Sequence, residues 1–341
     1  MTADTAFEMH MRKTGKASVL TARQVTLPAP GPGEARVKIE ATGVAYADIV
    51  MRQGLYPGVK TPVTPGYDFV GRIEAVGDGV EGFAVGQRVA ALTVTGSYAD
   101  RRNIDAKWLV PAPESADARA LVAAVLNGLT AWQMFHRIAV AAPGEWVLVH
   151  GAAGGVGNLL LEMARNAGVR AIGTASAGKK AVVEARGGVH LDYAAGDVAA
   201  KAREISGGGV VAAYDHIGGR HLKAVSVAAL RMGGTAILYG GYDATKGGKV
   251  NPGALVQMML NNSLSAMGLF GQSQGVVGYN VSYWRDARPE VYRQDLAAVL
   301  GAVADGSITP LIGATLPLSQ AAEAHEKLER ASVAGKIVLV P

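Results

Sequence analysis

The 341-residue chain contains no cysteine, which excludes a disulfide framework, a thiolate nucleophile and a cysteine-ligated zinc. Charged residues make up only 18%, and the excess of 33 basic over 28 acidic residues is scattered along the chain. A nucleic-acid partner is therefore not expected. No apolar run approaches the roughly 18 residues of a membrane span, and residues 1–16 lack the apolar core of a signal peptide. We expect a cytoplasmic protein with no membrane partner.

Glycine and apolar residues are abundant instead. The 45 glycines follow no triplet period, so a collagen-like fibre is excluded, and an apolar share of 49% is sufficient for buried cores. The length predicts two domains. The first third is expected to be a mostly antiparallel β domain, because residues 35–41 alternate apolar and polar side chains. Residues 117–136 predict a long helix.

After Pro143 the pattern changes to short apolar strands that alternate with helices, which is typical of a parallel sheet covered by helices. Further helices are predicted at 294–304 and 319–330. A last strand is predicted at 336–340. In the alternating region we expect a helix at 158–167 and strands at 145–150, 169–174, 210–215, 234–239 and 265–269.

The strongest chemical signal is the glycine-rich segment 150–157, His-Gly-Ala-Ala-Gly-Gly-Val-Gly, between a predicted strand and a predicted helix. In that context the backbone N–H groups and the positive end of the helix dipole converge on an anion. The spacing is that of the dinucleotide-binding fingerprint, with Ala152 in place of the first glycine. A pyrophosphate-binding loop is therefore predicted.

The end of the second strand of this region indicates which dinucleotide is bound. An NAD site places an acidic residue there to hold the ribose 2′-hydroxyl. The sequence here is Thr174-Ala-Ser176-Ala-Gly-Lys179-Lys180, which offers a hydroxyl and two ammonium groups and no carboxylate. These groups attract a 2′-phosphate, so NADP(H) is favoured, with Lys180 a better candidate than Lys179.

The order and spacing of several segments, from about residue 35 to 341, resemble one enzyme family. The segments are 53–56, 64–68, 71–77, 86–89, 148–157, 173–176 and 335–340. The chain resembles the zinc-independent quinone oxidoreductase (zeta-crystallin-like) branch of the medium-chain dehydrogenases/reductases. Within this branch, residues 52–56 and 147–157 are most similar to the vesicle amine transport protein homologues.

The resemblance implies an α/β fold with a Rossmann-type doubly wound parallel sheet and a β-rich GroES-like catalytic domain. Residues 1–125 and 272–341 would form the split GroES-like domain, and 126–271 the NADP(H)-binding domain. The active site would lie in the cleft between them. The resemblance also implies a homodimer through the cofactor domain, with strand 265–269 at the pairing edge.

The implied activity is NADPH-dependent reduction of a small electrophilic acceptor, a quinone or an α,β-unsaturated carbonyl. Zinc-dependent relatives carry a Gly-His-Glu motif and cysteine ligands, whereas this chain has Gly66-Tyr67-Asp68 and no cysteine, so no metal is expected. One alternative is a 2-enoyl thioester reductase. Another is an NADPH-binding protein with little turnover that acts by interaction.

The resemblance also assigns cofactor contacts. The pyrophosphate would lie on residues 153–156, and the backbone of 269–271 would reach the nicotinamide. The full set of implied contacts is Asn127, Thr130, Ala153, Gly154, Gly155, Val156, Ser176, Lys180, Tyr193, Gly241, Tyr242, Leu269, Phe270 and Gly271.

Three tyrosines are candidate proton donors, because a neutral phenol can protonate an enolate or semiquinone oxygen. They are Tyr46, Tyr56 and Tyr67. The alternative is that they only line the site and that water supplies the proton. Relatives carry an asparagine where this chain has Ala45. His150 is interpreted as a packing or locally hydrogen-bonded residue.

Overall fold

The computed structural model describes residues 5–241 and 264–341. The chain divides into two compact units: unit 1 is Met1–Leu129 with Val281–Pro341, and unit 2 is Thr130–Asn280. We expected the cofactor domain to end at residue 271. The sheet of unit 2 continues past that point, because strand β13 (Gly275–Gly278) pairs with β12 (Leu230–Leu238).

Unit 1 is built on a seven-stranded, largely antiparallel sheet with the order β14-β15-β3-β4-β5-β7, in which β6 also pairs with β3. Strands β1 (Thr5–His10) and β2 (Thr21–Thr26) form a separate two-stranded sheet. The strands of the larger sheet are β3 (Glu34–Val44), β4 (Asp68–Val76), β5 (Arg88–Leu92), β6 (Arg101–Asp105), β7 (Val110–Pro111), β14 (Ile312–Pro317) and β15 (Lys336–Val340).

The helices of unit 1 cover this sheet and close its main core. That core combines apolar residues of β3, β4, β5 and β15 with residues from helices far away in the sequence, including Leu121, Tyr292 and Ala324. The helices are α1 (Tyr46–Arg52), α2 (Ala118–Gln133), α10 (Val281–Ala287), α11 (Pro289–Ala304) and α12 (Ala321–Glu329). α2 crosses the boundary into unit 2.

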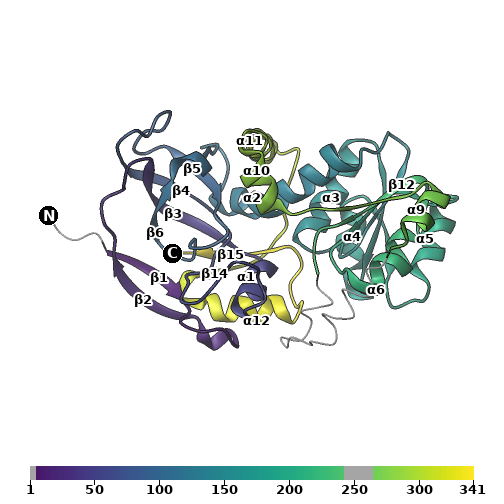
Figure 1. Cartoon of the computed structure of the whole chain (residues 1–341), viewed down its shortest axis with the longest axis horizontal. Coiled ribbons are helices and arrows are strands. Elements are labelled where there is room, and N and C mark those ends of the chain that lie inside the picture. The colour runs from purple at the N-terminus through teal and green to yellow at the C-terminus, as the bar shows by residue number, and fades with distance from the viewer. Residues whose placement is uncertain (1–4, 242–263) are drawn as a thin grey trace. The chain divides into compact units, whose positions relative to one another are not determined.

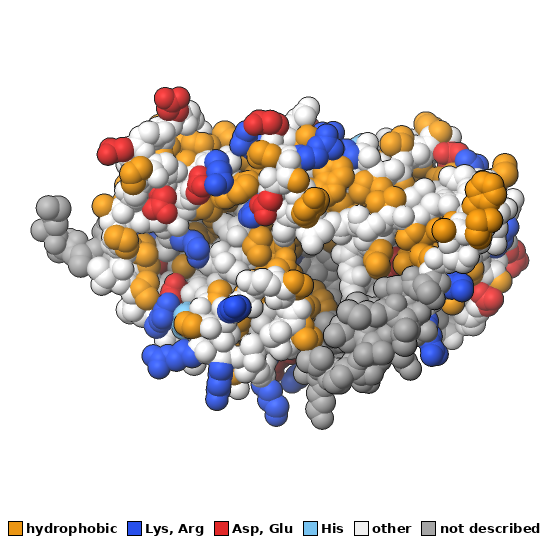
Figure 2. Space-filling model, viewed as in Figure 1, with side chains coloured by type: hydrophobic (Ala, Val, Ile, Leu, Met, Phe, Trp, Pro, Cys, Tyr) orange, Lys and Arg blue, Asp and Glu red, His pale blue; other side chains and the backbone are white. Residues whose placement is uncertain are grey.

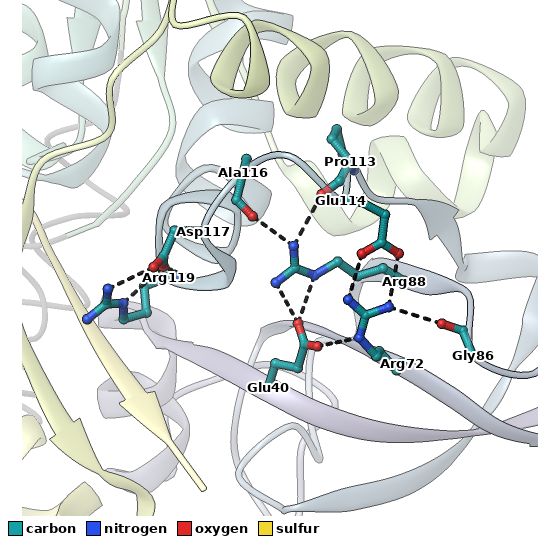
Figure 3. A network of polar contacts seen from close by, with 9 residues as sticks. All are labelled: Glu40, Arg72, Gly86, Arg88, Pro113, Glu114, Ala116, Asp117 and Arg119. Carbon is teal, nitrogen blue, oxygen red and sulfur yellow. Dashed lines mark hydrogen bonds and ion pairs between the residues drawn. The ribbon is translucent and has the colours of Figure 1, made fainter.

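A network of ion pairs joins the sheet of unit 1 to the segment that leads into α2 (Figure 3). Glu40 on β3 accepts from Arg72 at 2.8 Å and from Arg88 at 2.7 Å. The buried Arg88 also donates to the carbonyl of Ala116, and Arg72 pairs with Glu114. The Arg88 guanidinium thus donates both to the Glu40 carboxylate and to a loop carbonyl, because its several N–H groups point in different directions.

Unit 2 contains a six-stranded sheet in which every pairing is parallel, with the order β10-β9-β8-β11-β12-β13. Counted within the unit this order is 3-2-1-4-5-6, that of the dinucleotide-binding doubly wound fold. Helices lie beside its strands (Figure 1). Its remaining elements are β8 (Trp146–Val149), β9 (Arg170–Ala175), β10 (Gly188–Asp192), β11 (Val210–Asp215), α3 (Gly155–Asn166), α4 (Lys180–Ala185), α5 (Val198–Ser206), α6 (Gly219–His221) and α9 (Ala266–Gln272).

The predicted strand at 265–269 is wrong. These residues begin helix α9, and the Ser265 hydroxyl caps it by accepting from the Gly268 N–H at 3.2 Å. Side-chain capping satisfies a backbone donor that a helix start leaves unpaired, which favours a helix here over a strand. The edge strand is β13 instead. Among the described helices, none has both the length and the apolar character needed to cross a bilayer.

Candidate functional site

The glycine-rich loop lies where the sequence predicts it, between β8 and α3, and two of its glycines have no room for a side chain. Gly151 has a left-handed φ of +62°, and a Cβ there would lie 2.6 Å from the His216 ring. A Cβ on Gly157 would lie 2.7 Å from the Cα of Ala152. Because Gly151 takes the left-handed conformation, the alanine at 152 fits the turn without strain.

The loop presents the start of α3 as an anion site. Gly154 precedes the helix in an extended conformation, and the helix begins at Gly155. The first N–H groups of any α-helix have no partner within the helix, and they carry the positive end of its dipole. Ala153, Gly154, Gly155 and Val156 lie at this helix start, and their contact with a pyrophosphate stays a prediction.

The ends of the neighbouring strands lie along the same edge of the sheet, because β8, β9 and β10 are adjacent and parallel. Ser176 follows β9, and Lys180 begins α4 with its side chain 63% exposed and its Nζ 3.7 Å from Glu184. Tyr193 follows β10 and is exposed. The three residues predicted to hold the 2′-phosphate thus come from this shared edge.

The other predicted cofactor residues are more dispersed. Asn127 and Thr130 are buried on α2, and Gly241 comes shortly after β12. Tyr242 lies outside the described residues. Residues 269–271 lie within helix α9, and Phe270 is exposed. Their expected position at the end of a strand is not observed, and their contact with the nicotinamide stays a prediction.

Two of the three candidate proton donors meet in unit 1. The hydroxyl oxygens of Tyr56 and Tyr67 are 2.6 Å apart, and both contact the Ser282 hydroxyl. Tyr67 is buried and Tyr56 is half-buried. Tyr46 is the first residue of α1 and is half-buried. Sequence reasoning missed Ser282, because 215 positions separate it from Tyr67.

Burial keeps Tyr67 in its neutral form. Loss of hydration raises the pKa of its phenol well above the ordinary value, and the neighbouring Tyr56 raises it further. A phenol that does not ionise retains its proton at neutral pH and can donate it as a hydrogen bond. Tyr56, Tyr67 and Ser282 thus form a group of three hydroxyls in which Tyr67 is un-ionised.

The donor set around position 67 does not fit a zinc ion. Asp68 is fully buried, and its carboxylate accepts from the Gly43 N–H at 2.9 Å, the Leu126 N–H at 3.1 Å and Lys336 Nζ at 3.2 Å. The buried Lys336 ammonium thus already balances the charge of this carboxylate, and a dication beside the lysine would be repelled. Tyr67 holds its proton, and Ala45 offers no ligand atom.

A second buried carboxylate shapes the backbone on either side of this group. Asp48 accepts from the Ala45 N–H at 2.8 Å and from the Gly66 N–H at 3.0 Å, so it joins the start of α1 to the residue before Tyr67. Burial raises the pKa of Asp48 to about 7. Ala45, where relatives carry an amide, thus still has its backbone fixed.

Two known protein families together match most of the residues of this chain. Residues 31–114 match the alcohol dehydrogenase GroES-like domain, and residues 187–339 match the zinc-binding dehydrogenase family. The rat synaptic vesicle membrane protein VAT-1 homolog is 32% identical over 94% of this chain and 80% of its own length. The chain belongs to the medium-chain dehydrogenase/reductase family.

Relatives in this oxidoreductase family have named activities. A probable quinone oxidoreductase of Schizosaccharomyces pombe is 31% identical over 97% of this chain and 96% of its own length. A 2-haloacrylate reductase of a Burkholderia species is 32% identical over 97% of this chain and 98% of its own length. The expected family and fold are confirmed.

Solved structures agree with this assignment. A mycobacterial protein in complex with NADPH has 31% identity and a TM-score of 0.86, with coverage of 98% of this chain and 100% of its own. The Escherichia coli quinone oxidoreductase in complex with NADPH has 26% identity and a TM-score of 0.86, with coverage of 99% and 100%.

Replacing Lys336 by methionine is expected to destabilise unit 1, because it leaves the Asp68 carboxylate buried without its cation. Breaking a buried pair in this way costs about 3 to 5 kcal/mol. The measurement is urea unfolding followed by circular dichroism. The matched control is Lys327→Met, whose exposed pair with Glu323 should contribute less than about 1 kcal/mol. Equal effects of the two substitutions would show that the buried pair has no special role.

Proposed function

We propose that this chain is an NADPH-dependent oxidoreductase that reduces quinones or α,β-unsaturated carbonyl compounds without a catalytic zinc. The observation that carries the proposal is the buried ion pair between Asp68 and Lys336. In this pair the carboxylate beside Tyr67 is bound by a protein cation. Conjugated acceptors delocalise the charge that develops on reduction, so hydrogen-bond donors are sufficient in place of a Lewis acid. The reductases among the named relatives support this acceptor class.

The cofactor assignment rests on the carboxyl edge of the unit 2 sheet. The loop at 151–157 would hold the pyrophosphate by backbone N–H groups, and Ser176 with Lys180 would hold the 2′-phosphate. NADPH-bound structures of related proteins support this assignment. When bound, NADPH supplies the hydride.

The hydroxyl group of Tyr56, Tyr67 and Ser282 would supply the hydrogen bond and the proton. Carbonyl reduction develops negative charge on oxygen, and a neutral phenol within hydrogen-bonding reach stabilises that charge. Tyr67 can recover a proton through Tyr56, whose hydroxyl is 2.6 Å away and whose side chain is half-buried. The solvent would then be the final proton source.

A binding protein with little turnover is the second candidate. It is favoured by Ala45, which stands where relatives carry an asparagine amide beside the nicotinamide ribose. It is also favoured by the similarity to the VAT-1 homologs, whose names state no enzymatic activity. The 2-enoyl thioester alternative is not favoured by any cationic cluster in the sequence.

An acceptor screen with NADPH tests the activity, with quinones, alkenals and cyclic enones compared in parallel. We expect acceptor-dependent oxidation of NADPH. Tyr67→Phe should lower kcat with enones by about tenfold or more, and kcat with quinones less, because water can protonate a hydroquinone oxygen. Tyr283→Phe, at an exposed position on α10, is the control. Tight NADPH binding without oxidation by any acceptor would instead favour the binding protein.

The cofactor preference is tested with Lys180→Ala. Removing an ammonium group from the 2′-phosphate should raise the Kd for NADPH by about five- to tenfold and leave the Kd for NADH nearly unchanged, because an exposed charged hydrogen bond is worth roughly 1 kcal/mol. Lys201→Ala in α5 is the control, and fluorescence titration gives both constants. Equal losses for NADPH and NADH would contradict the phosphate role.

We infer further that two copies associate through strand β13, the terminal strand of the unit 2 sheet. An unpaired sheet edge offers a row of backbone hydrogen-bonding groups to a second strand. Exposed apolar side chains accompany it, namely Met232, Met267, Phe270 and Val277. Figure 2 shows hydrophobic side chains on the part of unit 2 that carries β12 and α9.

The two edge strands of the same sheet provide a matched test of this association. Val277 on β13 and Val189 on β10 are both exposed valines. In sedimentation analysis, Val277→Lys should convert a dimer to a monomer, whereas Val189→Lys should remain dimeric. A monomeric parent protein, or dissociation only by Val189→Lys, would refute the inference.

A further inference from the structure

A cluster of metal-ligating side chains lies beneath the glycine-rich loop in unit 2, and the proposed function makes no use of it. His150 follows β8, Asp215 ends β11, and His221 ends α6. One ligand atom from each residue lies within 4.8 Å of the others. Since β8 and β11 are adjacent parallel strands, their ends bring the first two residues together.

His150 has one satisfied and one unsatisfied ring nitrogen. Its Nδ1 is 3.1 Å from Thr174 Oγ1, whereas its Nε2 is buried and has no hydrogen-bond partner among the described residues. A buried polar atom without a partner costs free energy, and such atoms are rare in folded proteins. The hydrogen bond at Nδ1 is also the arrangement that orients a metal-binding histidine with its Nε2 lone pair available.

Asp215 is held in place by four hydrogen-bond donors. Its Oδ1 accepts from the Ile217 and Gly218 N–H groups at 2.7 and 2.9 Å, and its Oδ2 contacts Ser226 Oγ at 2.5 Å and His221 Nδ1 at 2.9 Å. These four donors hold the carboxylate in one orientation.

The two imidazole rings of the cluster pack together, and the His221 side chain is partly exposed. The rings of His150 and His221 are perpendicular, with centroids 4.4 Å apart. The His221 side chain is 21% exposed, whereas that of Asp215 is fully buried.

We propose that His150, Asp215 and His221 bind one divalent transition-metal ion such as Zn²⁺. Two imidazoles and one carboxylate form a donor set that suits this class of ion, with a fourth position left for water. Bond lengths of about 2.0 to 2.2 Å place neighbouring ligand atoms about 3.3 Å apart. An ion would therefore replace the 2.9 Å hydrogen bond between His221 Nδ1 and Asp215 Oδ2, and the three side chains would adjust around it.

A bound ion would join the ends of β8 and β11 and helix α6. It would give the orphaned His150 Nε2 a partner directly before the loop at 151–157. The site would be structural for the loop rather than catalytic, and it is distinct from the Tyr67–Asp68 position in unit 1. Its presence does not depend on which acceptor the enzyme reduces.

The test uses the full chain, freed of metal by a chelator and then titrated with Co²⁺ and Zn²⁺. We expect one ion per chain, the visible absorption of Co²⁺ in a site of low coordination number, and a Kd for Zn²⁺ on the order of 1 µM or tighter. His221→Phe keeps a ring beside His150 but removes the ligand nitrogens. It should weaken Zn²⁺ binding about 100-fold and abolish the Co²⁺ spectrum.

The matched control is His190→Gln in β10 of the same sheet, which should bind both ions like the parent protein. Thermal unfolding provides a second readout, because an ion that binds only the folded state raises Tm with its concentration. We expect this rise in the parent and in His190→Gln, but not in His221→Phe. If His221→Phe does not fold, His221→Gln replaces it. Absence of binding to the parent, or unchanged binding by the folded His221 variant, would overturn the proposal.

Discussion

Close packing in and around the loop at 151–157 is the constraint on which unit 2 depends. Gly151 leaves room for the His216 ring, and Gly157 lets the first turn of α3 lie against the backbone of Gly151 and Ala152. This close packing fixes the start of α3 above the carboxyl edge of the sheet. The proposed phosphate site, the end of β9 and the histidine cluster all lie along that edge, so one steric requirement aligns them.

In unit 1, the corresponding constraint is electrostatic. Asp68 and Lys336 are both buried, and the charge of each offsets the free-energy cost of burying the charge of the other. Asp68 also accepts from backbone N–H groups of β3 and α2, so a single carboxylate joins three segments. The adjacent Tyr67 thereby has a fixed backbone and a hydroxyl that meets Tyr56 and Ser282. Position 67 thus carries an uncharged hydrogen-bond donor beside a buried ion pair.

Local patterns predicted much of the fold. The strands at 210–215 and 336–340 were predicted with the observed bounds, and the glycine-rich loop was placed correctly, because these features depend on neighbours in sequence. The prediction of a strand at 265–269 was wrong because a short apolar run is compatible with both helix and strand. The Ser265 cap favours the helix. Lys336 and Ser282 were not predicted as partners of the 67–68 segment, since no local pattern links residues more than 200 positions apart.

The position of β15 determines when each unit can complete its structure during synthesis. This strand lies between β14 and β3 in the sheet and contributes Lys336 to the pair with Asp68. The ribosome makes residues 336–340 after all of unit 2 has been translated. Unit 2 can therefore fold while still attached to the ribosome, whereas the first 129 residues wait with an unpaired edge at β3 and with Asp68 lacking its counterion. Chaperone contacts on the nascent chain should accordingly be concentrated on β3 and its neighbours.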